Sequence, residues 1–150
     1  MINKISFKTK IGWISAFAKE DKIFRIQFGK IKFKNDKNKV LNNFKKNSLK
    51  FYLKKTKKIK AKCKIESSII QKKVWSELRK IKSGHTKTYG EIGKKLKISP
   101  RYVGKICSQN KLPLYIPCHR VIRSDGTLGG FTAKGGINLK KKLLNFEKSV

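Results

Sequence analysis

The sequence predicts an α+β fold in which a small N-terminal β-sheet lobe precedes a helical C-terminal lobe with a helix-turn-helix. Three features predict this order: alternating apolar residues over 1–30, a lysine- and asparagine-rich stretch of weak periodicity over 30–68, and clear helix-start signals further on. A chain of 150 residues fits one domain, or one domain with a small appended lobe. We place the boundary so that the β-rich lobe with its connector spans 1–66 and the second domain spans 67–150.

In the N-terminal lobe, apolar positions alternate on both sides of a short polar turn at Asp21–Lys22. This pattern is typical of a β-hairpin or a small sheet. One helix is expected near Val40 to Tyr52, although its apolar residues are only loosely spaced. The lysine-rich stretch over 53–64 has the composition of a solvated connector.

The second half begins with one apolar stripe at helical spacing and then shows two helix starts. Thr88 and Glu91 have the spacing of a capping box, and Ser99 followed by Pro100 reads as an N-cap with proline in the first turn. Two short helices separated by a tight break form a helix-turn-helix, a pattern that fits DNA binding and many helical bundles alike. The stripe of the first helix contains Ile69, Ile70, Val74, Trp75 and Leu78.

The last third is expected to contain an apolar, extended segment over 112–122 that Pro117 interrupts. Asp125–Gly126 is a turn signal, and Asn138 can cap a final helix. In that helix Leu139, Leu143 and Leu144 are expected to pack inward, and Lys140, Lys141 and Lys142 are expected to face outward.

The chain is strongly basic, with 40 Lys and Arg against 8 Asp and Glu and a formal net charge of +32. Such a charge attracts polyanions, and release of counterions from nucleic acid would favour binding. Because lysine is scattered along the whole chain, a general compositional bias also fits. Arginine is scarce, and three of its five positions lie within 101–123.

The cysteine and histidine content limits the redox and metal chemistry. Three cysteines without a CxxC pair indicate a reducing cytoplasm, and two histidines are too few for the common zinc spacings. No apolar run approaches the roughly 20 residues that a membrane helix needs. We therefore expect a soluble cytoplasmic protein with no metal, no cofactor and no membrane partner.

Cys118 lies next to an imidazole and a guanidinium, those of His119 and Arg120. A thiol with a pKa near ~8.5 is mostly protonated at neutral pH, and a nearby cation or base raises its thiolate fraction. Because adjacent side chains rarely face each other, His119 would act through a water. A small core cysteine remains the alternative interpretation.

The hexapeptide Ile116–Val121 resembles the active-site signature of the O6-alkylguanine-DNA alkyltransferases, or methylated-DNA–protein-cysteine methyltransferases. The similarity keeps its order and spacing over roughly half of the chain, and the N-terminal Thr9–Trp13 and Phe28–Gly29 are also similar to this family. The other matching segments are Val74–Trp75, Thr88–Ile92, Arg101–Gly104, Asn110–Pro117, Gly129–Phe131, Leu143–Leu144 and Glu147.

The resemblance implies a catalytic set. Cys118 would attack the alkyl carbon, His119 would take the thiol proton through a water, and Glu147 would orient His119. Asn110 would hold the turn beneath the cysteine by hydrogen bonds. The cysteine would be consumed, so each molecule would act once.

The resemblance also implies how DNA is handled. The substrate would be double-stranded DNA that contains O6-alkylguanine, and the damaged nucleotide would be flipped out of the duplex. Apart from the resemblance, we expect the protein to be a monomer. Arg101 would enter the base stack and Tyr89 would turn the phosphate, while the second helix would lie in the minor groove. The expected DNA contacts are Tyr89, Ser99, Pro100, Arg101 and Gly104.

A guanine pocket is implied by the same family pattern. Its expected residues are Val121, Phe131, Thr132 and Lys140, beside the backbone at Cys118. The chain departs from the family at Phe131, where many relatives have tyrosine, and at Tyr102, where a small residue is preferred. These departures bear on substrate range and rate.

Three other functions fit part of the sequence. An alkyltransferase-like lesion sensor would lack the cysteine, which is present here. A basic architectural DNA-binding protein would bind but accept no alkyl group. A cysteine hydrolase would need turnover and an oxyanion hole, and the basic surface suggests no substrate for it.

Overall fold

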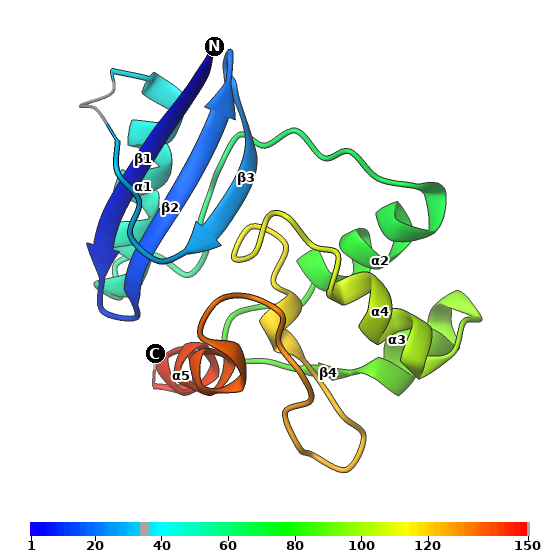
Figure 1. Ribbon diagram of the computed structural model, residues 1–150. Helices are drawn as coiled ribbons and strands as arrows, with labels where there is room; N and C mark the ends of the chain where they lie inside the picture. Colours follow the sequence, from blue (N-terminus) through cyan, green and yellow to red (C-terminus); the bar gives the residue numbers. More distant parts are fainter. Residues whose placement is uncertain (34–36, 150) are drawn as a thin grey trace. The chain divides into compact units, whose positions relative to one another are not determined.

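The computed structural model describes residues 1–33 and 37–149 and divides into two compact units, Met1–Ile65 and Glu66–Val150 (Figure 1). The division lies one residue before the boundary that the sequence predicts. The first unit is a sheet with one helix, and the second is mainly helical, so the expected α+β class is confirmed.

The first unit is built on a three-stranded antiparallel sheet in the order β1-β2-β3. Its strands are β1 (Ile2–Thr9), β2 (Gly12–Lys19) and β3 (Lys22–Phe28). Alternating apolar residues form the buried face of the sheet, as a half-buried antiparallel sheet requires. The predicted hairpin is therefore part of a three-stranded meander.

One helix, α1 (Lys39–Tyr52), packs on all three strands. It begins where the Asn38 side chain accepts a hydrogen bond from the Leu41 N–H, which satisfies one of the free donors of the first turn. The rings of Phe44 and Phe7 meet edge to face with centroids 5.8 Å apart. The helix expected near Val40 is confirmed and begins one residue earlier.

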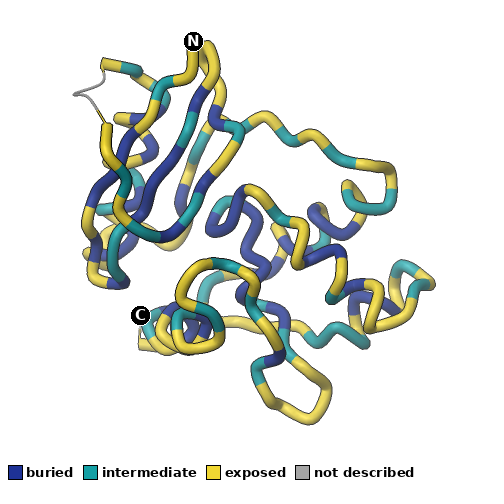
Figure 2. The backbone as a smooth tube through the Cα atoms, in the orientation of Figure 1, coloured by how far each residue is buried: buried dark blue, intermediate teal, exposed yellow. Residues whose placement is uncertain are grey.

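The lysine-rich connector over 53–64 is mostly exposed, as its composition predicts (Figure 2). It is nevertheless attached to the sheet, because the Ile23 N–H donates to the Lys62 carbonyl at 2.9 Å and the Lys64 N–H donates to the Ile23 carbonyl at 2.8 Å. Strand β3 is an edge strand whose free backbone groups need partners, and the connector supplies two of them.

The second unit contains four α-helices, one turn of 3₁₀ helix and a two-stranded parallel sheet in the described part of the chain. The helices are α2 (Ile69–Arg79), α3 (Tyr89–Leu96), α4 (Pro100–Cys107) and α5 (Gly136–Lys148), and η1 (Cys118–Arg120) is the 3₁₀ turn. The strands are β4 (Lys87–Thr88) and β5 (Val121–Ile122). In α2 the expected stripe is confirmed at Val74, Trp75 and Leu78, whereas Ile69 is 81% exposed.

Helices α3 and α4 form the predicted helix pair, joined by a three-residue turn. Both bonds of the capping box are present, from Glu91 N–H to the Thr88 hydroxyl and from Thr88 N–H to the Glu91 carboxylate. The Ser99 hydroxyl accepts from the Tyr102 N–H, and Pro100 occupies the first turn. The beginnings of both helices were predictable from the sequence, because each is fixed by hydrogen bonds between residues only three apart.

Two predictions about the last third of the chain were wrong. Residues 112–122 are not extended, because Leu114 has a φ of 75° and only Val121–Ile122 forms a strand. The segment is apolar because it is buried, and a short buried run does not distinguish a strand from a folded turn. Helix α5 begins after Gly135, and Asn138 lies inside its first turn.

The helix-turn-helix depends on a close approach at Gly93. A Cβ atom at this position would lie 2.5 Å from the Ile98 carbonyl oxygen, whereas one at Gly104 would lie 3.8 Å from the Tyr89 ring. We expect Gly93→Ala to lower the free energy of unfolding by about 1–3 kcal/mol, because backbone must move. We expect the matched Gly104→Ala change to be neutral or to stabilise by up to about 1 kcal/mol. Denaturant unfolding measures both, and equal effects would contradict the assigned turn.

Candidate active site

Cys118 lies at the start of η1 on a turn that Asn110 holds. The Asn110 side-chain amide donates to the Ile116 carbonyl at 2.8 Å and its oxygen accepts from the Leu112 N–H at 2.9 Å. Burial raises the pKa of the Cys118 thiol, and a hydrogen bond from Asn110 opposes this only in part. Cys118 is therefore a thiol at neutral pH until a base removes its proton.

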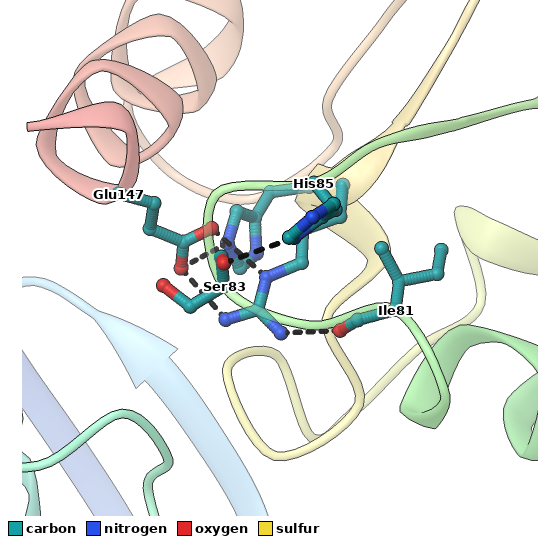
Figure 3. A network of polar contacts seen from close by, with 6 residues as sticks. Ile81, Ser83, His85 and Glu147 are labelled. Atoms are coloured by element: carbon teal, nitrogen blue, oxygen red, sulfur yellow. Dashed lines mark hydrogen bonds and ion pairs between the residues drawn. The ribbon is translucent and has the colours of Figure 1, made fainter. Parts of the chain in front are cut away.

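The Glu147 carboxylate connects three separate segments of the second unit (Figure 3). It lies 3.0 Å from His119 Nε2, and the Arg120 guanidinium donates to both of its oxygens at 2.8 Å. The remaining Arg120 nitrogen donates to the Ile81 carbonyl at 2.7 Å. The buried carboxylate thus joins helix α5 to the 3₁₀ turn, and Arg120 joins both to the loop after α2.

The charges in this network follow from the burial of its members. Burial would raise the pKa of Glu147, but hydrogen bonds from Arg120 and His119 hold it at about 2. Burial also lowers the pKa of His119, against the effect of Glu147. At neutral pH the carboxylate is ionised and the imidazole is neutral. His119 Nδ1 is buried and has no hydrogen-bond partner among the described residues, so it can accept a proton.

A cavity of about 790 Å³ opens beside Cys118 within the second unit. It is lined by α3, α4, the turn at Cys118 and the loop over 123–132. Seven of the residues predicted for the site line this cavity: Tyr89, Pro100, Arg101, Gly104, Cys118, Phe131 and Thr132. The cavity therefore brings the helix-turn-helix and the cysteine together in one place.

Lys140 is fully buried, so the prediction that it faces outward was wrong. Its ammonium donates to the Val121 carbonyl at 2.7 Å, the Gly130 carbonyl at 3.3 Å and the Tyr89 hydroxyl at 3.3 Å. Burial lowers the pKa of Lys140 to about 8 and raises that of Tyr89 to about 12. Lys140 does not line the cavity but supports the wall that Tyr89 and Gly130 form.

The chain is similar to known proteins over most of its length. Residues 69–149 match the family model described as 6-O-methylguanine DNA methyltransferase, DNA binding domain. A methylated-DNA–protein-cysteine methyltransferase of Methanocaldococcus vulcanius is 41% identical over 134 residues, which cover 87% of this chain and 80% of the relative. One of Metallosphaera sedula is 34% identical over 152 residues and covers 100% of this chain and 96% of the relative.

The chain belongs to the 6-O-methylguanine DNA methyltransferase family. A solved O6-methylguanine DNA methyltransferase of Methanococcus jannaschii has a TM-score of 0.68 with 28% identity and covers 96% of this chain and 93% of its own. The O6-methylguanine methyltransferase of Mycobacterium tuberculosis, at 24% identity, shares the fold with a TM-score of 0.85 over 99% of this chain and 94% of its own. The family and the fold expected from the sequence are confirmed, and the chain is a methyltransferase of this family.

Three of the residues predicted to surround the base or the DNA lie outside the cavity lining: Ser99, Val121 and Lys140. The sequence also gave no sign of the role of Arg120. Its position after His119 did not indicate that its guanidinium donates to both oxygens of the Glu147 carboxylate. The cavity has six lining residues that were not predicted for it: Cys107, Ser108, Arg123, Ser124, Gly129 and Gly130. The glycine pair and the arginine-rich segment were the available signals for three of them.

The residues that the structure describes contain no group of three or more His, Cys, Asp or Glu side chains placed to hold a metal ion. In the same part of the chain, no helix has the length and apolar character to cross a membrane. None of the three cysteines forms a disulfide bond with another described residue.

The Glu147 network predicts a specific loss of stability in acid. The pKa of Glu147 is lower in the folded state than the 4.5 of an ordinary carboxyl, so its contribution is present above pH 4.5 and is lost as pH falls toward 2. We expect Glu147→Gln to destabilise by about 3 kcal/mol at pH 7 because Arg120 loses its buried partner. Thermal unfolding across pH should show this difference shrinking between pH 5 and 2.

The exposed Glu20, in the first unit, provides the control for this measurement. Glu20→Gln should change the free energy of unfolding at pH 7 by less than about 0.5 kcal/mol, because an exposed carboxylate has no buried partner to lose. A difference between wild type and Glu147→Gln that stays constant from pH 7 to pH 3 would contradict the ionised, paired state of Glu147.

Proposed function

We propose that this protein repairs double-stranded DNA by transferring the alkyl group of O6-alkylguanine to Cys118 in a single turnover. The observation that carries the proposal is the Cys118 thiol on the wall of a cavity. The next residue in the chain is a histidine whose Nδ1 has no hydrogen-bond partner among the described residues and whose Nε2 lies 3.0 Å from Glu147. A thiol, a base and a carboxylate that orients the base are the parts of an activated nucleophile.

The proposed reaction is a direct displacement at the alkyl carbon. The Cys118 proton passes through a water to His119 Nδ1, and the sulfur forms a bond to carbon as the carbon–O6 bond breaks. The raised pKa of the thiol fits this order, because the proton leaves only when a base is in place. The charge that develops on His119 is stabilised by the ionised Glu147.

The leaving guanine must gain a proton, and Tyr89 is the proposed source. Its pKa of about 12 keeps the hydroxyl protonated at neutral pH, and the Lys140 ammonium lies 3.3 Å from the same oxygen. A donor held by a buried cation can stabilise negative charge on the base. Asn110 is proposed to act on the position of Cys118 through the turn beneath it.

The transfer is proposed to end with a stable thioether. A sulfur–carbon thioether bond has no leaving group that water could readily displace at neutral pH, so the cysteine is consumed. This chemistry requires a reduced thiol, which suits a cytoplasmic protein. We also propose that the protein acts as a monomer, since all of the groups in this reaction come from one chain.

DNA is proposed to bind along the helix-turn-helix. Arg101 lies at the start of α4 and lines the cavity, so its side chain can enter the base stack when the nucleotide is flipped. Pro100 and Gly104 lie on the same helix, and Ser99 caps its start. Phe131 and Thr132 line the cavity that would receive the base. Helix α4 is proposed to lie in the minor groove, whose pattern carries little sequence information.

Transfer to Cys118 is tested by intact-protein mass spectrometry after incubation with a duplex that contains O6-methylguanine. We expect the mass of one methyl group per molecule, located by peptide mapping on Cys118, with no further uptake in excess substrate. Cys107→Ser removes the other buried thiol of the cavity and should still accept the methyl group, whereas Cys118→Ser should not. Tight binding to this duplex without methylation would contradict the proposal and would indicate a lesion sensor or an architectural DNA-binding protein.

The flipping role of Arg101 predicts a loss that depends on the substrate. We expect Arg101→Ala to slow methyl transfer from duplex DNA by about tenfold or more. Without the inserted side chain, nothing would offset the few kcal/mol that flipping the nucleotide costs. Reaction with free O6-benzylguanine should change by less than about twofold, since no stacked base must be replaced. Arg25→Ala, at an exposed arginine of the first unit, is the control. Equal losses on both substrates would rule out the role.

A further inference from the structure

The first unit carries a lysine-rich segment that the proposed reaction does not use. Residues 37–65 contain 12 lysines and no aspartate or glutamate. All 12 are exposed. Four of them are considered as one surface, called the lysine strip: Lys39, Lys46 and Lys50 of α1, and Lys60 of the connector.

The strip lies on the solvent face of α1. The helix turns by about 100° per residue, so Lys39, Lys46 and Lys50 fall within about 40° of one another. The buried residues Phe44 and Ser48 lie on the opposite side, where α1 packs on the sheet. Eleven residues of helix separate the two ends of this row, which gives a length of ~16 Å.

The connector brings a fourth lysine to the same helix. The Asn47 side-chain amide donates to the Lys60 carbonyl at 3.0 Å, so this part of the connector lies beside the middle of α1. Ile59, one residue earlier, is buried and fixes the connector further. The strip is thus held by helix and connector together.

The positive charge of the strip is not balanced locally. None of its four lysines forms an ion pair with any residue in 1–33 or 37–149, whereas Lys62 nearby is paired with Asp21. Lys39 lies at the N-terminus of α1, where the helix dipole disfavours a cation, and Lys46 and Lys50 repel each other at a spacing of four. An anionic partner would remove each of these penalties.

We propose that the lysine strip is a second DNA-contact surface, which binds the phosphates of duplex DNA without regard to sequence or damage. Duplex DNA offers one charge per about 1.7 Å of axis, so a row ~16 Å long meets several phosphates. The proposal concerns the first unit and does not depend on alkyl transfer.

Two features of the segment favour duplex DNA over other polyanions. The aromatic residues Phe44, Phe51 and Tyr52 are buried, so the strip offers no ring on which single-stranded bases could stack. The apolar face of α1 is covered by the sheet, so it cannot enter a membrane as an amphipathic helix does. What remains is a row of point charges, which suits a phosphate backbone.

The expected consequence is tighter binding to undamaged DNA. Two contact surfaces on one chain raise the affinity for a long polymer through effective concentration. The protein would remain near DNA between lesions, and the affinity would depend steeply on salt.

The test compares two variants of the full chain that lose the same charge. In the strip variant, Lys39, Lys46, Lys50 and Lys60 are each changed to Gln. In the control variant, four exposed lysines of the sheet and its turns are changed in the same way: Lys8, Lys10, Lys19 and Lys22. Circular dichroism checks that both variants fold, and affinity for an undamaged duplex is measured from 50 to 300 mM salt.

We expect the strip variant to reduce the slope of log Kobs against log salt by about 0.9 for each phosphate that the protein no longer neutralises, or about 2–4 in total. The control variant should reduce it by less than about 1. Equal reductions in the two variants, or no reduction in the strip variant, would overturn the proposal. So would a strip variant that binds DNA normally but no longer binds phosphatidylserine vesicles that the wild type binds.

Discussion

The second unit depends on a single buried carboxylate. Glu147 is 3% exposed, and an ionised group at such a depth is tolerated only when it is paired and hydrogen-bonded. Arg120 meets both of its oxygens, and His119 meets one of them. Because Arg120 also binds the Ile81 carbonyl, the last helix, the 3₁₀ turn and the loop after α2 are fixed to one another.

This constraint determines what the imidazole can do. With Nε2 directed at Glu147, only Nδ1 is left to receive a proton, and burial keeps the ring neutral. Cys118, beside it in the chain, retains its proton because its own burial raises the pKa of the thiol. Before the reaction the site therefore contains a neutral thiol and a neutral imidazole on consecutive residues, and charge develops only during the reaction. A resting thiol of this kind reacts little with other electrophiles.

The features that depend on neighbouring residues were predictable from the sequence. The capping box at Thr88 and the cap at Ser99 use bonds that span three residues, so the helix pair followed from local chemistry. Lys140 was misplaced because its partners, Val121 and Gly130, are remote in sequence and unremarkable in kind. Arg120 was missed for the same reason, since its role depends on a carboxylate 27 residues away. The catalytic set came from the family resemblance, because a cysteine beside a histidine has several ordinary explanations.

The state of His119 is the most direct test of this account. Nitrogen-15 NMR of labelled imidazole, with His119 assigned by comparison with His119→Gln, reports which ring nitrogen carries the proton and at what pH the ring charges. We expect a neutral ring at pH 7 with the proton on Nε2 and a pKa below the usual 6.5. A doubly protonated ring at pH 7, or a neutral ring with its proton on Nδ1, would contradict the assignment of Nδ1 as the base.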